Sequence, residues 1–352
     1  MDHESRSRLV VVSMRSGSSV VESIRAWIPS EAVLKVPDEK DRLTLEGLLP
    51  DASVLLNWDE PVSSETLVAA RKLKLIQHMG TIPLNVDLAA AERQGVPVAI
   101  IPATNWYSVA EHCWALLLAC AKRLVEGHER VTSRVNPKGL EPMRTSATRF
   151  AYNWSEMKGV VTVRGKTIGI VGAGKIGLEF ARIARGFGVN VMYTKRNRLP
   201  EWLEQALRLQ YVYPDELWQR SDIICVHVAH SEETEGLVDK RAFDLMKHGV
   251  MIINTARGSV IDEPSLVAAL RSGKVAYAGL DVFTYEPPLR DCALLDLPNV
   301  VLTPHYASGF DSSPSANAHI NRWRTENIER LLRGDPPLHL VTEASLRRYW
   351  SS

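Results

Sequence analysis

The stretch that decides the fold is Ile168-Gly-Ile-Val-Gly-Ala-Gly-Lys-Ile-Gly177, close to the middle of the 352-residue chain. An apolar run over 167–171 precedes the glycines and is typical of a buried strand, while the amphipathic pattern over 175–187 predicts a helix. Glycines with G-x-G-x-x-G spacing between a strand and a helix mark a phosphate-binding turn. We therefore expect a dinucleotide-binding Rossmann unit here, rather than a plain strand–helix turn.

Each glycine of this turn has its own physical use. Gly172 allows the tight turn, Gly174 lets a pyrophosphate approach the backbone, and Gly177 lets the helix pack closely on the strand. The N-terminus of the helix offers its free N–H groups to the phosphates. The residues predicted to bind the cofactor here are Gly172, Ala173, Gly174, Lys175, Ile176 and Gly177.

Strand-like and helical patterns alternate on both sides of the turn, which predicts an α/β fold with parallel sheets. The polar segment 136–159 lacks a clear period and is expected to form a surface loop or a weak helix. Upstream, the sequence predicts strands at 9–12, 54–56, 73–76 and 96–101, helices at 63–72 and 84–94, and one long helix over 108–131. Downstream, it predicts strands at 189–193, 222–228, 250–254, 276–280 and 300–302, and helices after Asp262 and over 321–332.

The composition excludes several classes of partner. Lysine and arginine total 42 residues against 41 aspartates and glutamates, so no net field would attract nucleic acid or an anionic membrane. The longest apolar stretch, 113–121, is too short to cross a bilayer. The four cysteines show neither C-x-x-C nor zinc-type spacing. We therefore expect free buried thiols, no metal, and a cytoplasmic protein.

The turn after the second strand of the Rossmann unit bears on the choice of cofactor. An acid usually holds the ribose of NAD about twenty residues after the glycines, but here the chain reads Thr194-Lys195-Arg196. Lys195 and Arg196 would attract a 2′-phosphate, and a charged hydrogen bond contributes roughly 1.5–3 kcal/mol. The sequence thus favours NADP(H), with NAD(H) as the alternative if this is only a solvated basic turn.

Three later segments each follow a predicted strand, so they fall at the carboxyl edge of the sheet, where such folds bind ligands. The segments are Ile253-Asn-Thr-Ala-Arg-Gly-Ser-Val-Ile-Asp-Glu263, Ala278-Gly-Leu-Asp-Val-Phe-Thr-Tyr-Glu-Pro-Pro288 and Leu302-Thr-Pro-His-Tyr-Ala-Ser-Gly309. They supply Arg257, Glu286 and His305. Alone, these would be read as a surface ion-pair residue, a loop acid and a structural histidine; together they form a candidate catalytic set.

With the glycine turn, these segments closely resemble the D-isomer-specific 2-hydroxyacid dehydrogenase family, in particular its glyoxylate and hydroxypyruvate reductase-like members. The resemblance runs from about Leu73 to Pro336 and includes Asn85-Val-Asp87 and Ser108-Val-Ala-Glu-His112. It implies a Rossmann cofactor domain over 106–307, inserted in a discontinuous flavodoxin-like substrate domain over 1–105 and 308–352. It also implies a homodimer formed through the cofactor domain, and reduction of a small 2-oxo acid to its D-2-hydroxy acid.

The resemblance assigns roles to individual residues. Arg257 would bind the substrate carboxylate and polarise the reacting carbonyl, a task that suits its fork of N–H donors. His305 would donate a proton to the carbonyl oxygen, and Glu286 would orient its ring and favour the imidazolium. Further residues placed by the resemblance are Thr255, Ala256 and Asp281 beside the cofactor, and Gly80, Thr81 and Asn105 beside the substrate.

The substrate and the exact reaction stay open at this point. Pro83 removes a backbone donor from the loop that would hold the substrate carboxylate, so glyoxylate, hydroxypyruvate and bulkier 2-oxo acids are all candidate substrates. Trp58, Trp106 and Tyr107 either line the pocket or pack the domain junction. In formate dehydrogenases the partner of the catalytic histidine is a glutamine. The acid Glu286 at this position therefore argues against a formate dehydrogenase. Oxidation of phosphite, or a role as a dinucleotide-sensing corepressor, would also fit these residues.

Overall fold

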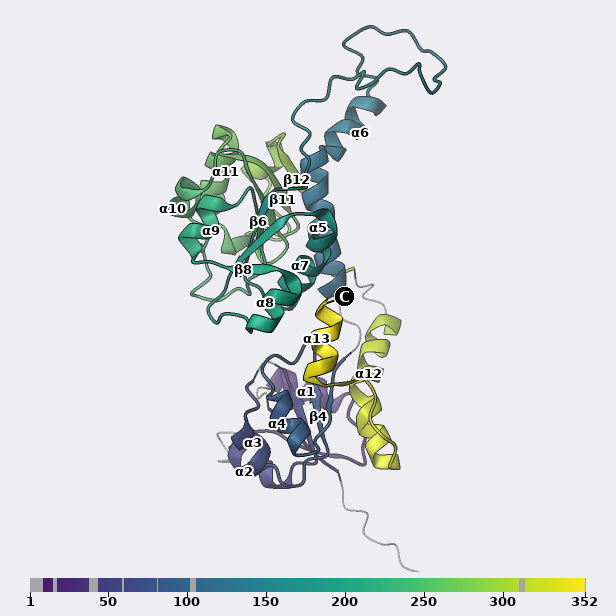
Figure 1. Ribbon diagram of the computed structural model, residues 1–352, viewed down its shortest axis with the longest axis vertical. Coiled ribbons are helices and arrows are strands. Elements are labelled where there is room, and N and C mark those ends of the chain that lie inside the picture. The colour runs from purple at the N-terminus through teal and green to yellow at the C-terminus, as the bar shows by residue number, and fades with distance from the viewer. Residues whose placement is uncertain are drawn as a thin grey trace, which may run out of the picture. The chain divides into compact units, whose positions relative to one another are not determined.

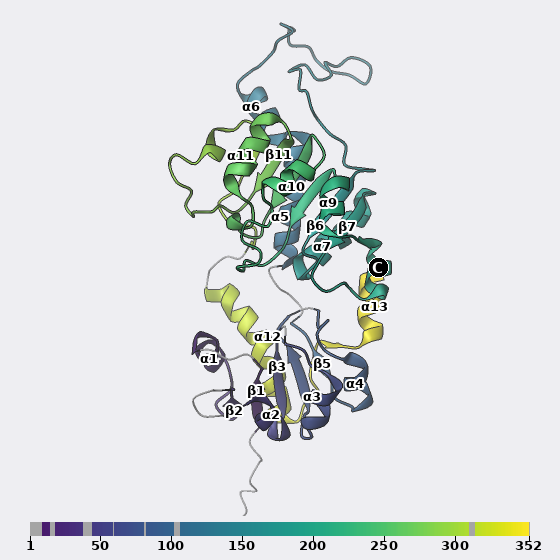
Figure 2. The same cartoon turned by 90° about the vertical axis from the view of Figure 1, so that its left-hand side faces the viewer.

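The computed structural model describes residues 9–14, 18–37, 44–58, 60–80, 82–101, 106–309 and 314–351. The chain divides into two compact units, Met1–Thr104 with Phe310–Ser352, and Asn105–Gly309. Figures 1 and 2 show the elements of each unit from two sides. Within the described residues, no helix is both long and apolar enough to span a membrane. Thr81 and Asn105, which the sequence analysis placed beside the substrate, lie outside the described residues.

The Asn105–Gly309 unit is built around a seven-stranded parallel sheet with the order β12-β11-β10-β9-β6-β7-β8. From β6 the chain winds outward through β7 and β8, then crosses back to β9 on the other side of β6. This reversal between β6 and β9 is the switch point at which open parallel sheets bind ligands. The strands are β6 (Thr167–Val171), β7 (Asn190–Thr194), β8 (Leu209–Tyr211), β9 (Ile223–Val226), β10 (Val250–Asn254), β11 (Val275–Leu280) and β12 (Val300–Leu302).

Helices flank this sheet, because parallel strands need crossover connections (Figure 1). Among them, α5 packs on β10, β11 and α7. The Trp114 ring of α5 stacks on Phe180 and Phe187 of α7, with centroid separations of 4.8 and 4.2 Å, which ties α5 to the helix that follows the glycines. The helices are α5 (Trp106–Lys122), α6 (Leu124–Thr132), α7 (Lys175–Phe187), α8 (Glu201–Leu207), α9 (Pro214–Arg220), α10 (Lys240–Leu245) and α11 (Glu263–Ser272).

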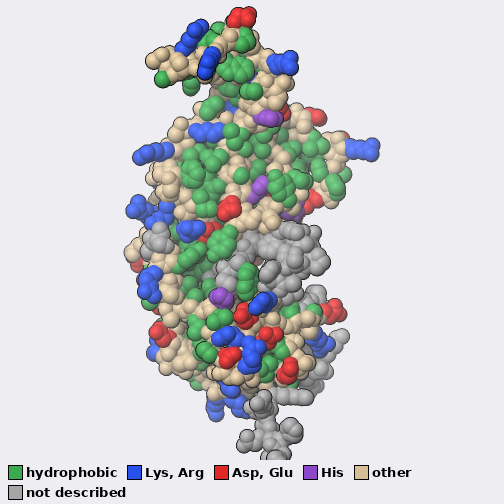
Figure 3. All heavy atoms as spheres, turned by 90° about the vertical axis from the view of Figure 1, so that its right-hand side faces the viewer, with side chains coloured by type: hydrophobic (Ala, Val, Ile, Leu, Met, Phe, Trp, Pro, Cys, Tyr) green, Lys and Arg blue, Asp and Glu red, His purple; other side chains and the backbone are tan. Residues whose placement is uncertain are grey.

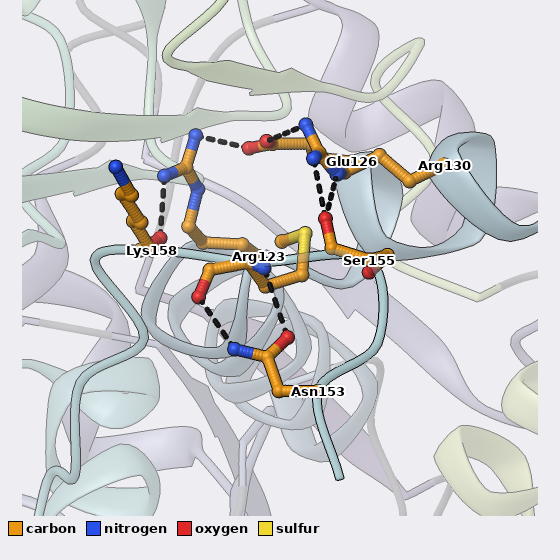
Figure 4. Close-up of polar contacts among 7 residues, drawn as sticks. Arg123, Glu126, Arg130, Asn153, Ser155 and Lys158 are labelled. Carbon is orange, nitrogen blue, oxygen red and sulfur yellow. Dashed lines mark hydrogen bonds and ion pairs between the residues drawn. The ribbon is translucent and has the colours of Figure 1, made fainter. Parts of the chain in front are cut away.

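The single helix predicted over 108–131 is wrong in one respect, because it is broken at Arg123. This residue has a left-handed backbone, with φ of +51°, and separates α5 from α6. Its guanidinium pairs with Glu126 and donates to the Lys158 carbonyl oxygen at 2.6 Å, and Arg130 donates to the Ser155 carbonyl oxygen at 3.1 Å (Figure 4). These contacts with the returning chain offset the cost of a positive φ at a residue with a side chain.

Residues 133–166, between α6 and β6, contain no helix or strand, which agrees with the surface loop expected over 136–159. The side chain of Asn153 closes a turn in this segment by bonding the backbone N–H and carbonyl of Met157, at 2.9 and 3.0 Å (Figure 4). We call α6 with the following residues, 124–160, the arm, because they extend away from the sheet (Figures 1 and 2).

The second unit has a six-stranded sheet with the order β13-β5-β4-β3-β1-β2, which contains the flavodoxin-like order 2-1-3-4-5. The sheet is parallel as predicted, except at one edge, where β13 pairs with β5 in antiparallel fashion. A short antiparallel edge strand is common on otherwise parallel sheets, because no crossover helix has to follow it. The strands are β1 (Val10–Ser13), β2 (Val33–Lys35), β3 (Val54–Asn57), β4 (Leu75–His78), β5 (Val98–Ala99) and β13 (Leu340–Val341).

Helix α12 (Pro314–Arg333) is tied to the sheet of this unit by buried polar groups. The Asn327 side-chain amide donates to Gln77 Oε1 at 2.8 Å and to the Leu338 carbonyl at 3.1 Å. The helix expected over 84–94 begins only at Leu88, because Asp87 caps it by accepting the Ala90 N–H at 2.8 Å. The helices are α1 (Ser18–Arg25), α2 (Leu45–Leu48), α3 (Ser64–Ala69), α4 (Leu88–Arg93), α12 (Pro314–Arg333) and α13 (Glu343–Ser351).

Candidate cofactor and catalytic site

The glycine turn after β6 has the geometry that its spacing predicted. Gly172 has φ of +94°, and a Cβ there would lie 2.9 Å from the backbone nitrogen of Val228. A Cβ on Gly177 would lie 2.7 Å from the Gly172 carbonyl oxygen, so α7 could not pack this closely on the turn. A Cβ on Gly174 would meet nothing within 4 Å. The turn is therefore closed toward the protein at Gly172 and Gly177 and open at Gly174, where a ligand can approach the backbone.

A cavity of about 720 Å³ lies against this turn. Gly172, Gly174, Lys195 and Arg196, all predicted to bind the cofactor, line it. The sequence motifs do not point to the other lining residues, which include Trp218, His227, Val228, Ser231, Glu233 and Thr234. Five of these residues, and His227 first among them, follow β9, the strand across the switch point from β6. Their position after β9 could have identified them, because ligand-binding residues lie at the carboxyl ends of the strands that flank the switch point.

One cation of the basic turn after β7, Arg196, forms an ion pair within the chain. Arg196 is 76% exposed on its side chain and forms an ion pair with Glu233, across the mouth of the cavity that both residues line. Lys175, at the start of α7, lies 4.6 Å from the centre of the Trp106 ring, so Trp106 packs beside the glycine turn. Glu233 therefore competes with any anionic ligand for the guanidinium of Arg196.

The buried carboxylate of Glu204 holds the turn after β7 in place. Glu204 accepts the Tyr193 hydroxyl at 2.5 Å and two bonds from Arg198, at 2.9 and 2.7 Å. The pKa of Glu204 is lowered, mainly by the hydrogen bond from Arg198 and also by the one from Tyr193. Burial of the carboxylate has the opposite effect on this pKa. Arg198 therefore has a structural role. The cations that line the cavity are Lys195 and Arg196.

His305 and Glu286, which the sequence predicts as an acid–base pair, are in contact. Nδ1 of His305 lies 2.6 Å from Oε2 of Glu286, whose other oxygen accepts the Phe283 N–H at 3.1 Å. Burial works to raise the pKa of Glu286, but the hydrogen bonds from His305 and Phe283 and the charges of His305 and Arg257 outweigh it and lower that pKa. His305 has φ of +52°, a sparsely populated conformation that is found mainly where the surroundings fix it.

Arg257 comes from the end of β10. Its guanidinium donates to the Ala256 carbonyl at 2.6 Å, and its own carbonyl accepts the Asn254 side-chain amide at 2.9 Å. The next residue, Gly258, lies directly against the chain segment that leads to Glu286. Arg257 is exposed and close enough to Glu286 to help lower its pKa, so the structure brings the three predicted catalytic residues into one neighbourhood.

Glu286 and His305 line a second cavity of about 480 Å³, together with Phe283, Leu302 and Thr303. This cavity is distinct from the one against the glycine turn, although both belong to the Asn105–Gly309 unit. Thr255 and Ala256, predicted beside the cofactor, are buried at the end of β10. Gly80 is buried in the other unit, where its carbonyl accepts the Ile101 N–H at 3.0 Å.

Asp281, predicted to lie beside the nicotinamide, is completely buried under the loop that carries His305. Its carboxylate accepts the Thr303 hydroxyl at 2.6 Å and the backbone N–H groups of Tyr306 and Ala307 at 3.2 and 2.9 Å. Nε2 of His112 lies 3.0 Å from the same hydroxyl. The carboxylate therefore holds the 303–307 loop, and its contact with a cofactor stays a prediction.

Comparisons with known proteins place the chain in a family. The family model "D-isomer specific 2-hydroxyacid dehydrogenase, NAD binding domain" matches residues 114–307. The chain is 35% identical to a glyoxylate reductase of Korarchaeum cryptofilum, over 83% of each protein. It is 34% identical to a D-3-phosphoglycerate dehydrogenase of Archaeoglobus fulgidus over 84% of its own length, but spans only 52% of that relative.

The solved structures agree with these sequence relatives. A glyoxylate reductase from Paecilomyes thermophila superposes with a TM-score of 0.54 at 27% identity, over 96% of this chain and 99% of that one. The likeness covers both units of this chain, with its seven-stranded parallel sheet and its mostly parallel six-stranded sheet. From the matched family model and the relatives above 30% identity, the chain belongs to the D-isomer specific 2-hydroxyacid dehydrogenase family, and residues 114–307 contain its NAD-binding domain.

Proposed function

We propose that this protein reduces a small 2-oxo acid of the glyoxylate type to the D-2-hydroxy acid, with a reduced nicotinamide dinucleotide as the hydride donor, and catalyses the reverse reaction. The observation that carries the proposal is the 2.6 Å contact between His305 Nδ1 and Glu286 Oε2. A histidine held by a carboxylate on one nitrogen presents the other nitrogen, Nε2, to a substrate as a proton donor.

The proposed chemistry divides between the bound cofactor and three side chains. The dinucleotide, when bound, supplies a hydride to the carbonyl carbon, and His305 Nε2 gives its proton to the carbonyl oxygen, which becomes the hydroxyl. The hydrogen bond to Glu286 keeps the ring of His305 oriented, with Nε2 directed away from the carboxylate. Arg257 binds the substrate carboxylate through its fork of donors and draws electron density from the carbonyl.

The cofactor would lie in the cavity against the glycine turn. The open space at Gly174 fits a pyrophosphate, and the N-terminus of α7 directs N–H groups toward it. Lys195 and Arg196 in the same cavity support a preference for NADP(H) over NAD(H). We assign residues 106–307 as the cofactor domain and 1–105 with 308–352 as the substrate domain, to which Gly80, Thr81 and Asn105 would contribute.

We further propose that the protein is a homodimer through its cofactor domain. The arm exposes large apolar side chains that a dimer interface would remove from water: Leu124, Val125, Val131, Phe150 and Tyr152. Figure 3 shows apolar side chains gathered on this face of the Asn105–Gly309 unit, with few charged ones among them. Large apolar side chains exposed in this way favour association. The free buried cysteines fit a reducing, cytoplasmic setting.

A panel of 2-oxo acids, each run with NADH and with NADPH while the absorbance of the reduced cofactor is followed, tests the proposal. We expect turnover of glyoxylate or hydroxypyruvate with the larger kcat/KM for NADPH. Phosphite and formate with the oxidised cofactors test the competing oxidations. Tight dinucleotide binding without turnover of any 2-oxo acid would contradict the enzyme proposal and favour a dinucleotide-sensing protein.

A further inference from the structure

Two cysteines and a histidine meet in the interior of the Asn105–Gly309 unit, apart from the catalytic residues. Cys113 comes from α5, Cys225 from β9, and His227 from just beyond the end of β9. One ligand atom from each, the two sulfurs and a ring nitrogen, lies within 4.8 Å of the other two. We infer that these three side chains form a binding site for a thiophilic divalent ion of the zinc class, on the inner wall of the cofactor cavity.

The fold accounts for this meeting of three residues. Cys225 and His227 are two positions apart on an extended chain, so their side chains leave the same face of the sheet. Helix α5 packs over the neighbouring strands β10 and β11 and presents Cys113 to that face. Both thiols are completely buried, so the sulfur atoms are removed from water and held by packing.

The separations suit a tetrahedral ion. Zn–S bonds of about 2.3 Å and Zn–N bonds of about 2.0–2.1 Å put tetrahedral ligand atoms roughly 3.5–3.8 Å apart. The Cys113 sulfur lies 3.8 Å from His227 Nε2 without any ion, so only small side-chain movements are needed. Two thiolates with one imidazole are the soft donor set that selects zinc-class ions over magnesium or calcium.

A buried polar atom beside the cluster points to a ligand. Oγ1 of Thr255 is buried and has no hydrogen-bond partner among the described residues. Thr255 is more than nine-tenths buried and directly follows β10, the strand that pairs with β9. Buried polar atoms without partners are rare in native proteins and commonly mark an ion or a water molecule. An ion coordinated by the three side chains leaves its fourth position for such a hydroxyl or a water molecule.

The ion also has a route of entry. His227 lines the cavity against the glycine turn, so its ring separates that cavity from the buried sulfurs. An ion from solvent can therefore reach the histidine first and the thiols next, with loss of their protons.

The test is a titration of the full-length protein, reduced with a phosphine and freed of metal, with Cd²⁺ as the probe and Zn²⁺ as the competitor. We expect one equivalent of Cd²⁺ to produce thiolate-to-metal charge-transfer absorption, which Zn²⁺ displaces. Cys113→Ser and Cys225→Ser should each weaken Cd²⁺ binding by at least about tenfold, since loss of even an outer partner has that effect. Cys120→Ser is the matched control, because Cys120 is a second buried thiol on α5, outside the cluster.

One further variant, His227→Asn, keeps the inference testable if a cysteine variant does not fold. Should Cys113→Ser fail to fold by circular dichroism, Cys225→Ser and His227→Asn test the same site from β9. Absence of the absorption band in the wild type would overturn the inference. So would a band that persists in the Cys225→Ser and His227→Asn variants or disappears in Cys120→Ser. The measurement does not depend on turnover, so its failure would leave the proposed reductase activity standing.

Discussion

Gly258 lies so close to Phe283 that a Cβ at position 258 would be only 1.9 Å from the Phe283 carbonyl carbon. The residue before Gly258 is Arg257, and Phe283 begins the turn that ends at Glu286 and donates its N–H to that carboxylate. The absence of one side chain thus allows the arginine segment and the glutamate segment to come together.

We expect Gly258→Ala to separate these segments. The atoms it would strike are backbone atoms, which cannot rotate away, so the fold should lose about 1–3 kcal/mol or more, as in overpacked interiors. Turnover should fall further than stability alone explains. Thermal unfolding and kcat/KM measure the two effects. The control is Gly186→Ala in α7, where a Cβ meets nothing within 4 Å and should stabilise the helix. Equal behaviour of the two variants would contradict the packing argument.

His305→Asn should remove the proton donor while leaving the dinucleotide site intact. We expect kcat to fall by about 100-fold or more, since general acid catalysis contributes that much. The affinity for NADPH, followed by its fluorescence, should be nearly unchanged, because His305 and the glycine turn line different cavities. Wild-type turnover in this variant would rule out the proposed general acid.

The carboxylate partner gives a dependence on pH. A carboxyl group whose pKa is lowered in the folded state stabilises the fold above its ordinary pKa of 4.5, and this contribution is lost as the pH falls through the lowered pKa. The wild type should therefore have a higher Tm than Glu286→Gln at neutral pH, and the difference should shrink below pH 4.5. A difference in Tm that grows on acidification would contradict the prediction that ionised Glu286 stabilises the fold.

Cofactor choice should respond to the basic turn. Lys195→Ala combined with Arg196→Asp should shift the ratio of kcat/KM for NADPH and NADH by about 10- to 100-fold toward NADH, since a charged hydrogen bond is lost. Glu233→Gln should act in the opposite direction, because it frees Arg196 from its ion pair. If neither variant changes the ratio, these residues do not contact the 2′-phosphate.

The buried carboxylate under that turn should matter for stability. Glu204→Ala leaves the hydroxyl of Tyr193, a completely buried residue, without its 2.5 Å partner. Leaving a buried polar group unsatisfied costs about 1–3 kcal/mol, which urea unfolding would measure. Glu201→Ala on the same helix is the control, because its side chain accepts a hydrogen bond from the exposed amide of Gln205. Similar losses in both variants would argue against a structural role for the network.

The sequence predicts the elements around the glycine turn best. The bounds of β6 and α7 agree with the predicted 167–171 and 175–187, because a buried strand and an amphipathic helix are both set by local periodicity. The break at Arg123 could not be foreseen in this way. Arginine favours helices, and the left-handed turn is held by Lys158, which lies 35 residues further along the chain.

In the candidate site, too, features set by local sequence could be predicted and features set by the fold could not. Arg257, Glu286 and His305 could be proposed from the sequence because each lies in a motif after a strand, and motifs are local. His227 and Glu233 were missed because only the strand order places them opposite the glycine turn. The edge strand β13 was missed too, since two residues carry almost no periodicity.

The buried carboxylate of Asp281 has a consequence for the proposed proton-transfer step. Two of its three bonds to the 303–307 loop come from main-chain amides, which every substitution in the loop other than proline leaves in place. In the proposed mechanism the imidazole of His305 is therefore already aimed when a ligand arrives, and little rearrangement is left for the moment of proton transfer. Evolution can vary the residues around that loop and change the ligand accepted, while the direction of the proposed acid stays constant.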